Sequence, residues 1–475
     1  MSWAQEELKN LDLGDKRLNE RGAEVLHTLG NKPTLSIPAA CGGWSETKAT
    51  YNFFSNDKVD RAEILKTHHD EIIKRSENDD ILLCPQDTSE LDFTSQKNND
   101  AHGFLNRTER KGHYLHATLV TTPNRLCLGV LEMKVITRDQ LKNQMSKEEK
   151  KIHKALPLEN KESYRWVESY IKACEFARRL PEKQVISMGD RECDFYDFLS
   201  TANSYMNTNE PYADWIIRGT WNRNTKAENG DESTIINEVS AESAIAEVEF
   251  IMPARDGVAA RRVKQQVKIK RVQIKSPDHK SNLTAEGNQI IYVTAILASE
   301  IDVPEGCEAV EWLLLSNIQV NLKEEALNIL RWYLCRWDIE IFFKILKSGC
   351  EIEKMQLKTA ASIENCLAIY MLVAWRILYI TVLGRECPDM PADIVFSDYE
   401  WQAVCIATTK KPPPPDPPKL HDMVIMIASL GGFLNRKSDG NPGVKVIWAG
   451  MQRMLDMAVM LEMLSSPQIP RATYG

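Results

Sequence analysis

Five polar side chains recur at helical spacing in one short stretch of the sequence. They are Tyr333, Arg336, Glu340, Lys344 and Lys347, and mostly apolar residues fill the positions between them. At about 100° per residue, the five side chains fall within an arc of roughly 80° on one amphipathic helix. That face carries a single carboxylate among four groups that can bind an anion.

Two aspartates elsewhere follow short apolar runs that are typical of buried strands. Asp87 ends the run "DDILLCPQD", and Asp190 ends the run "QVISMGD". Side chains at strand ends lie at the rim of a sheet, where sites are commonly built. Together with Glu340 the aspartates supply three hard oxygen ligands, which select Mg²⁺ or Mn²⁺. Because the set contains no His or Cys, it argues against zinc.

This combination suits phosphoryl transfer on a nucleic acid. Two divalent ions about 4 Å apart clamp the attacking and leaving oxygens of an in-line displacement. The Tyr, Arg and Lys groups of the same face would bind neighbouring phosphates. The alternative interpretation is structural. Arg336, Glu340 and Lys344 would then form i,i+4 pairs on a solvated helix face, each contributing only about 0.3–0.5 kcal/mol.

Composition limits the class of protein. The chain has 475 residues and a net charge of −8, which favours several domains and argues against a wholly basic surface. Its 11 cysteines are dispersed without a CxxC pair, which indicates reduced thiols in a cytoplasm. The N-terminal sequence lacks the apolar core of a secretory signal. The most apolar stretch, 367–384, is interrupted by Arg376 and indicates a buried helix rather than a membrane span.

The order of the patterns predicts an α/β fold with three domains. Helical spacing dominates residues 1–75, and strand-like runs separated by a long helix follow in 76–385, where we expect a mixed sheet. A β-rich insertion is predicted at about 235–310, and a proline-rich linker and helices at 386–475. The insertion contains a basic run, 255–280, which fits either a strand edge guarded by lysines or a phosphate-binding surface.

The last helical pattern is rich in methionine, from Met451 to Met463. Methionines spaced by three residues give a broad apolar surface. Such a surface packs in a core or, near a chain end, against a second copy of the chain.

The residues that suggest phosphoryl transfer also resemble a known family. The stretch "YLCRWDIEIFFKILK" resembles the Y-R-E-K motif of the insertion-sequence-four group of bacterial cut-and-paste DDE transposases. The blocks "DTSELDF" from Asp87 and "DRECDFYDF" from Asp190 resemble the family's two other catalytic blocks, and the resemblance extends from about residue 3 to 464. It implies a ribonuclease-H-like core, a helical N-terminal domain that binds terminal inverted repeats, and C-terminal helices that dimerise.

The resemblance also implies roles for single residues. Asp87, Asp190 and Glu340 are then the catalytic carboxylates, holding Mg²⁺, for which Mn²⁺ can substitute. Tyr333, Arg336 and Lys347 become phosphate-positioning groups, and Lys344 joins them from the predicted helix face.

Two further DNA contacts are implied outside that stretch. Trp312 stands where the family places a tryptophan that stacks on a flipped base, although a core aromatic is the alternative. Arg218 resembles a DNA-contacting arginine, but Gly219, Thr220 and Trp221 replace the basic residues that follow it in the family. The linker also departs from the family, because it is proline-rich rather than basic.

The sequence therefore predicts a bacterial, nucleoid-associated DNA transposase. It would act as a homodimer on double-stranded transposon ends and target DNA, and no membrane is expected. Two alternatives remain: a metal-dependent DNA nuclease without strand transfer, and a non-catalytic protein that binds transposon ends and inhibits transposition. The segment "WSETKATYNFF" and the helix from Leu13 are the candidate readers of the end sequence.

Overall fold

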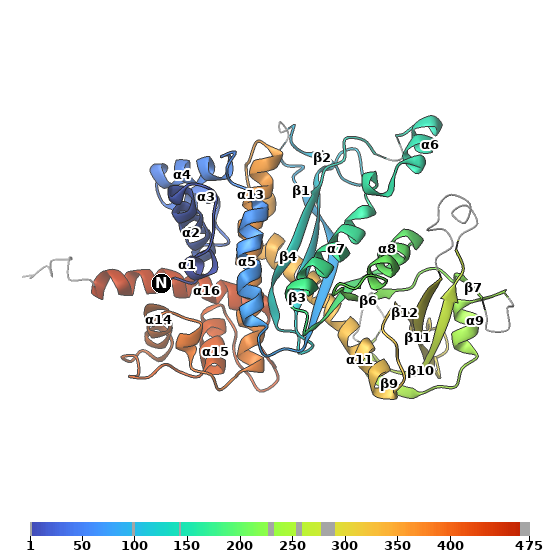
Figure 1. Cartoon of the computed structure of the whole chain (residues 1–475). Helices are drawn as coiled ribbons and strands as arrows, with labels where there is room; N and C mark the ends of the chain where they lie inside the picture. Colours follow the sequence, from blue (N-terminus) through green and yellow to red (C-terminus); the bar gives the residue numbers. More distant parts are fainter. Residues whose placement is uncertain are drawn as a thin grey trace, which may run out of the picture. The chain divides into compact units, whose positions relative to one another are not determined.

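The computed structural model of the chain describes residues 2–96, 100–141, 144–226, 232–252, 259–276 and 290–465 (Figure 1). The chain divides into two compact units. The first unit comprises 1–78, 88–145 and 338–475, and the second comprises 79–87 and 146–337. Strand β1 (Ile81–Asp92) contributes residues 81–87 to the second unit and 88–92 to the first. The three predicted domains stay a prediction.

The first unit is mainly helical, as predicted for both ends of the chain. Its N-terminal helices are α1 (Trp3–Glu7), α2 (Lys16–Asn31), α3 (Ile37–Cys41), α4 (Trp44–Phe54) and α5 (Arg61–Arg75). Its strands besides β1 are β2 (Gly103–Phe104), β3 (Lys111–Thr121) and β4 (Cys127–Ile136). Its later segments are α12 (Asp338–Lys344), the π-helical η5 (Ile345–Gly349), η6 (Ile352–Lys354), α13 (Ala360–Glu386), η7 (Ala392–Ile394), α14 (Asp398–Thr409), α15 (Leu420–Leu430) and α16 (Val444–Ser465).

Helix α13 is the centre of this unit and lies alongside α5 and β4 (Figure 1). It is long and apolar enough to cross a membrane, but 83% of its most apolar window is buried inside the protein. Arg376 is partly buried, and its guanidinium lies 4.5 Å from the centre of the Trp3 ring. Burial of this kind identifies α13 as a core helix, as the interrupted apolar stretch predicted.

A buried polar network ties α1 to α5. Glu7 of α1 is 5% exposed and His68 of α5 is fully buried, and the two side chains are hydrogen-bonded. Arg75 Nη1 donates to the other Glu7 oxygen at 2.9 Å. Burial by itself raises the pKa of Glu7, but His68 and Arg75 outweigh it and lower this pKa to about 2. Glu7 is therefore ionised and paired, as a buried charge must be.

The second unit contains the larger part of the mixed sheet. Its strands are the first part of β1, β5 (Gln184–Gly189), β6 (Asp214–Arg218), β7 (Asn224–Lys226), β8 (Glu232–Thr234), β9 (Ala246–Met252), β10 (Arg261–Ile274), β11 (Ile291–Ile301) and β12 (Glu311–Ser316). Its helical segments are α6 (Lys147–Ala155), η1 (Leu158–Asn160), α7 (Tyr164–Arg179), η2 (Arg191–Cys193), α8 (Tyr196–Met206), α9 (Ile235–Ser240), α11 (Lys323–Leu334) and η4 (Cys335–Trp337).

The strand order in this unit is β1-β5-β6-β12-β11-β10-β7-β8, with β9 also paired to β10. The pairs β1–β5 and β5–β6 are parallel, whereas β6–β12, β12–β11 and β11–β10 are antiparallel. Parallel strands joined through helices and flanked by antiparallel strands give a mixed α/β sheet. The predicted fold is confirmed, since this arrangement is consistent with a ribonuclease-H-like core that carries a β-rich insertion.

The insertion begins with helix α9 and continues as strands β9, β10 and β11. The structure corrects one alternative for its basic run, the sheet edge. Strand β11 pairs along one side of β10, while β9 and β7 pair with 261–267 and 273–274 on the other side. The described cations of β10 are largely paired with acids: Arg261 with Glu300, Arg262 with Glu249, Lys264 with Glu247 and Lys270 with Glu242. The parts of the run at 255–258 and 277–280 lie outside the described residues.

Candidate functional site

Asp87 and Asp190 lie at matching positions on neighbouring parallel strands. The last paired residues of β1 and β5 are Pro85 and Met188. Asp87 and Asp190 each follow two residues later, and both are half-buried. The second unit therefore presents two carboxylates at the carboxyl edge of its parallel strands, which is where α/β sheets build their sites.

The strand that carries Asp87 is longer than the sequence predicted. Asp87 was expected at the strand end, but β1 continues to Asp92, and its later residues lie next to β3 in the first unit. The expectation was wrong because the polar residues after Asp87 break the apolar run, whereas backbone pairing does not require apolar side chains. For example, the Thr88 hydroxyl forms a hydrogen bond with His116 Nδ1 of β3 at 2.8 Å.

Asp190 caps the short turn η2 that follows β5. Its carboxylate accepts a hydrogen bond from Glu192 N at 2.7 Å. Burial raises the pKa of Asp190, whereas the Glu192 N–H and the nearby charges of Arg336 and Arg165 lower it. A carboxyl in this setting gains from a bound cation, because a cation stabilises its ionised form.

Arg336 and Tyr333 reach the same two strands from the helical segment α11–η4. Arg336 is 8% exposed, and its Nη1 lies 2.8 Å from Asp87 Oδ2. The Tyr333 hydroxyl donates to the carbonyl oxygen of Gly189, the residue before Asp190, at 3.3 Å. Burial and Asp190 raise the pKa of Tyr333 to about 12, while Arg336 and Arg218 oppose the rise. Tyr333 therefore remains a neutral hydrogen-bond donor.

The stretch from Tyr333 to Lys347 is not the single helix that we expected. Helix α11 ends at Leu334, a 3-10 turn spans 335–337, α12 spans 338–344, and a π-helical turn follows. A 3-10 turn has three residues per turn, so an ideal 100° step no longer places the later side chains. As a result, Tyr333 and Arg336 are buried, whereas Glu340 and Lys344 are exposed.

The break also divides the predicted site between the two units. Glu340, Lys344 and Lys347 belong to the first unit. Lys347 Nζ donates to the carbonyl oxygen of Glu90 at 3.0 Å, in the same unit. Asp338, the one acid on the predicted apolar side, is 5% exposed and pairs with Arg125. The assignment of Glu340 as the third catalytic carboxylate stays a prediction.

Trp312, Arg218 and Tyr333 form an aromatic–cation cluster in the second unit. The Trp312 ring centre lies 6.3 Å from that of Tyr333 and 6.4 Å from that of Trp337. The Arg218 guanidinium lies 5.6 Å from the Trp312 ring centre. Trp312 is only partly buried, so a fully buried core aromatic does not describe it. Trp337 is 48% exposed and was missed by sequence reasoning, although an aromatic directly after Arg336 was the available signal.

The donor chemistry of the aspartate pair fits a divalent cation. Two adjacent carboxylates at a sheet edge are hard oxygen ligands of the kind that Mg²⁺ and Mn²⁺ prefer. Over the ranges that the structure describes, no three His, Cys, Asp or Glu side chains group closely enough to hold a metal ion. In the second unit Arg336 supplies the positive charge next to Asp87. The pair therefore fits part of a metal site.

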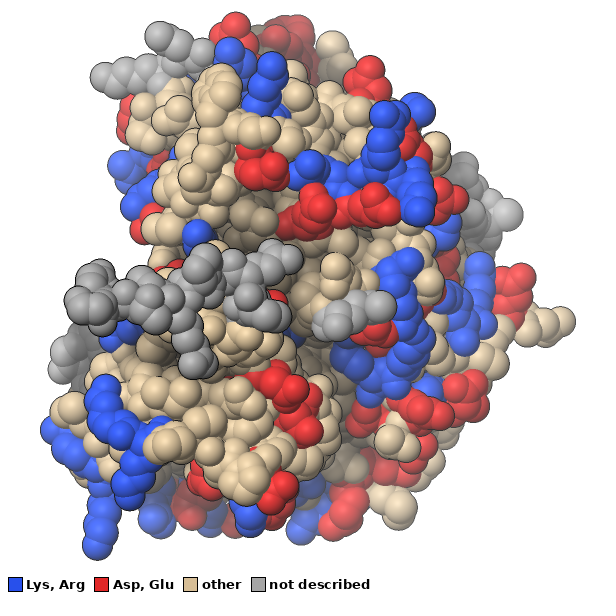
Figure 2. All heavy atoms as spheres, turned by 90° about the vertical axis from the view of Figure 1, so that its left-hand side faces the viewer, with Lys and Arg blue, Asp and Glu red and all other residues tan. Residues whose placement is uncertain are grey.

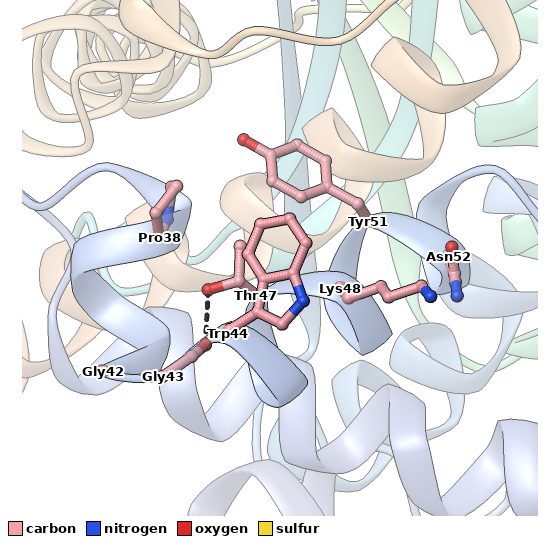
Figure 3. A pocket seen from close by; sticks show the side chains of 8 residues that line it. All are labelled: Pro38, Gly42, Gly43, Trp44, Thr47, Lys48, Tyr51 and Asn52. Atoms are coloured by element: carbon pink, nitrogen blue, oxygen red, sulfur yellow. Dashed lines mark hydrogen bonds between the residues drawn. The ribbon is translucent and has the colours of Figure 1, made fainter.

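A second candidate surface lies on α4 in the first unit. A hollow of about 780 Å³ is lined by α4 and the residues before it: Pro38, Gly42, Gly43, Trp44, Thr47, Lys48, Tyr51 and Asn52 (Figure 3). Trp44, Lys48, Tyr51 and Asn52 are spaced by four, three and one residues, which places them on one helix face. Trp44 is 82% exposed, and Thr47 Oγ1 closes the first turn by donating to the Gly43 carbonyl at 2.7 Å. This face places the exposed ring of Trp44 beside the polar groups of Lys48, Tyr51 and Asn52. It suits a ligand that has flat rings and hydrogen-bonding groups.

Helix α16 ends in an exposed apolar surface. Its inner side is buried, including Met451 and Met454. Further along, Met460 is 58% exposed, Met463 54% and Leu464 70%. The first half of the methionine-rich pattern therefore packs in the core, and packing of its exposed end against a second copy stays a prediction.

Comparison with known proteins identifies the two ends of the chain. Residues 1–59 match the family model described as transposase DNA-binding, and residues 372–465 match the model described as transposase Tn5 dimerisation domain. Both matches are to transposase models, so the chain resembles Tn5-type transposases at its two ends. The α4 surface lies in the DNA-binding match and the exposed end of α16 in the dimerisation match. DNA and a second copy of the chain are therefore its partners, and the predicted resemblance is confirmed.

The DNA-binding match is not strongly basic. Acidic and basic residues nearly balance over 1–59. Figure 2 shows Lys and Arg interspersed with Asp and Glu over one face of the molecule. Charge balance of this kind weakens sequence-independent attraction to DNA phosphates, so specific contacts carry a larger share of recognition.

Proposed function

We propose that this Tn5-like transposase binds transposon inverted-repeat ends, cleaves them by two-metal phosphoryl transfer and joins the freed 3′-OH ends to target DNA. The observation that carries the proposal is the second unit's pair of adjacent carboxylates, Asp87 and Asp190, in a chain with DNA-binding and dimerisation domains at its ends. We further propose that the protein works in the bacterial cytoplasm, on the nucleoid.

Asp87, Asp190 and Glu340 would hold Mg²⁺, or Mn²⁺ in its place. When bound, the ions supply an activated water and neutralise charge on the scissile phosphate. Water adds to phosphorus, the bond to the 3′ oxygen breaks, and a 3′-OH remains on the transposon end. No covalent bond to the protein forms, because positioning and charge stabilisation lower the barrier.

The remaining steps use that hydroxyl as the nucleophile. We propose that it attacks the opposite strand and forms a hairpin, which a second water reopens. The same 3′-OH then attacks a phosphate of the target DNA. In each step a water or a 3′-OH adds to phosphorus and one P–O bond breaks. The same three carboxylates therefore serve every step.

The chain's own cations and aromatics would position the DNA. Arg336 is well placed to exchange its contact with Asp87 for a phosphate, because a guanidinium binds either oxyanion in the same fork geometry. Lys344 and Lys347 would bind flanking phosphates. Trp312, held between Arg218 and Tyr333, would stack on a base turned out of the duplex. Stacking offsets part of the few kcal/mol that unpairing costs.

We assign end recognition to the α4 face. Lys48 and Asn52 offer hydrogen-bond donors, and Trp44 offers an exposed ring for contact with sugar or base. Lys48→Ala and Asn52→Ala should each weaken binding of the cognate end by about 5- to 150-fold, at roughly 1–3 kcal/mol per specific base contact. Lys66→Ala, which removes a 69% exposed lysine of α5 outside the DNA-binding match, is the matched control. Equal binding by all three variants in a gel shift would remove α4 from recognition.

A strand-transfer assay separates this proposal from its alternatives. A precut end with a 3′-OH, target plasmid and Mg²⁺ should give joined product. A nuclease without strand transfer would nick uncut ends but leave the precut end unjoined. A non-catalytic inhibitor would bind ends and do neither.

A further inference from the structure

The turn between β6 and β7 displays an exposed tryptophan. Trp221 is 62% exposed, although a tryptophan side chain is usually largely buried. An aromatic side chain left exposed in this way calls for a physical reason of its own.

The backbone of this turn is fixed by one buried aspartate. The Asp194 side chain has no exposed surface. Its Oδ2 accepts from Thr220 N at 2.6 Å and from Trp221 N at 2.9 Å. Its Oδ1 accepts from Arg223 Nε at 3.1 Å, and Arg223 Nη2 also donates to the Asp194 carbonyl at 2.8 Å.

Further bonds hold the turn on both sides. Gly219 N donates to the carbonyl oxygen of Leu313 on β12 at 2.8 Å, and Arg223 N donates to the carbonyl oxygen of Trp221 at 2.9 Å. The backbone of Trp221 is therefore bonded through both its N–H and its C=O. The ring is exposed on a rigid support, so binding through it requires little backbone ordering.

The same bonds place the turn at the aspartate site. Thr220 Oγ1 donates to the carbonyl oxygen of Arg191, the residue directly after Asp190, at 3.1 Å. Arg218, three residues before Trp221, is close enough to Asp190 for their charges to interact, as is Arg191 to Arg218. Arg218, Arg191 and the carboxylate of Asp190 therefore lie beside the turn that carries Trp221, all within the second unit.

We infer that Trp221 stacks on a base of the DNA strand bound at this site. This inference rests on the proposed function and adds a second stacking residue to Trp312, on a different element. An arginine pair binds the phosphate backbone, and an exposed ring next to it binds the flat face of a base, which every base offers. The contact replaces sequence-independent charge attraction by stacking, in keeping with the weakly charged DNA-binding segment.

The test combines protein variants with altered DNA. We compare Trp221→Ala, Trp221→Phe and a control, Ile251→Ala, which removes a 71% exposed apolar residue of β9 in the same unit. Nicking rates are measured on transposon ends that carry a single abasic site at successive positions near the cleavage point.

Trp221→Ala should slow nicking by roughly 5- to 150-fold, the range that corresponds to the loss of one stacked base. Trp221→Phe should stay within about threefold of the wild type, and Ile251→Ala should equal it. At one position the abasic site should slow the wild type but not slow Trp221→Ala further, since the contact is already gone.

Three results would each overturn the inference. They are wild-type nicking by Trp221→Ala, an abasic profile that is the same for this variant and the wild type, and nicking by Trp221→Phe as slow as by Trp221→Ala. The last would show that ring stacking is not the cause. Failure of the wild-type chain to nick any end would instead refute the proposed function.

Discussion

The ion pair between Arg336 and Asp87 gives the sharpest test of the second unit's site. The side chains are 9% and 18% exposed and 2.8 Å apart. Removing one partner of a fully buried pair costs about 3–5 kcal/mol, and the residual exposure of both side chains puts the cost of Arg336→Ala somewhat below this range. We therefore expect Arg336→Ala to lower the free energy of unfolding by about 2–3 kcal/mol in EDTA.

A double-mutant cycle isolates the pair from other effects of truncation. Urea unfolding is measured for the wild type, Arg336→Ala, Asp87→Ala and the double variant. The double variant should be less destabilised than the sum of the single ones, by about 1–2 kcal/mol, because neither residue then leaves an unpaired charge.

Metal binding supplies the second half of this test. Mg²⁺ should stabilise Arg336→Ala more than the wild type, since a bound cation replaces the missing guanidinium beside Asp87. Additive effects within about 0.5 kcal/mol, or equal stabilisation of both proteins by Mg²⁺, would show that Arg336 is not the resident partner of Asp87.

Three further predictions concern Glu7, Asp190 and the exposed end of α16. Because the pKa of Glu7 is lowered from 4.5 to about 2, its pairing stabilises the fold above pH 4.5, and this contribution is lost as the pH falls through 2. Glu7→Gln should thus cost about 2–3 kcal/mol at pH 7 and nothing near pH 2, while exposed Glu6→Gln should cost little at either pH. The raised pKa of Asp190 has the opposite sign, since the folded state disfavours its charge. Asp190→Asn should raise the thermal midpoint in EDTA at pH 7. The gain should shrink as the pH falls through the raised pKa of Asp190 and vanish below the ordinary aspartate pKa, and a loss of stability at pH 7 would contradict this. Met460→Glu together with Met463→Glu should weaken dimerisation by about 10- to 100-fold in sedimentation, and an unchanged monomer–dimer equilibrium would exclude the end of α16 from the interface.

The strand that delivers Asp190 was readable from the sequence because its signal is local. A short apolar run that ends in Gly-Asp predicts a buried strand and the point where it ends. Strand β5 ends at Gly189, as expected. The helical ends of the chain and the start of α11 at Lys323 were readable for the same reason, since local apolar spacing marks them.

Features that depend on neighbours elsewhere in the chain were not readable. The break at 335–337 occurs where Tyr333 and Arg336 bond to β5 and β1, and those partners are more than a hundred residues away in sequence. The position of β10 inside its sheet depends on pairing with β9 and β11, which the sequence does not reveal. Its cations therefore fitted the pattern of an edge strand protected by lysines. Local propensity is overridden in both places by tertiary contacts.

The central claim is that Glu340 completes the metal site of Asp87 and Asp190. The most direct measurement is nicking of uncut transposon ends in Mg²⁺ by Glu340→Gln, beside Glu324→Gln, which alters an exposed carboxylate of α11. We predict that Glu340→Gln binds ends like the wild type and nicks them at least about a thousandfold more slowly, while Glu324→Gln is unaffected. Nicking by Glu340→Gln at the wild-type rate would contradict the claim.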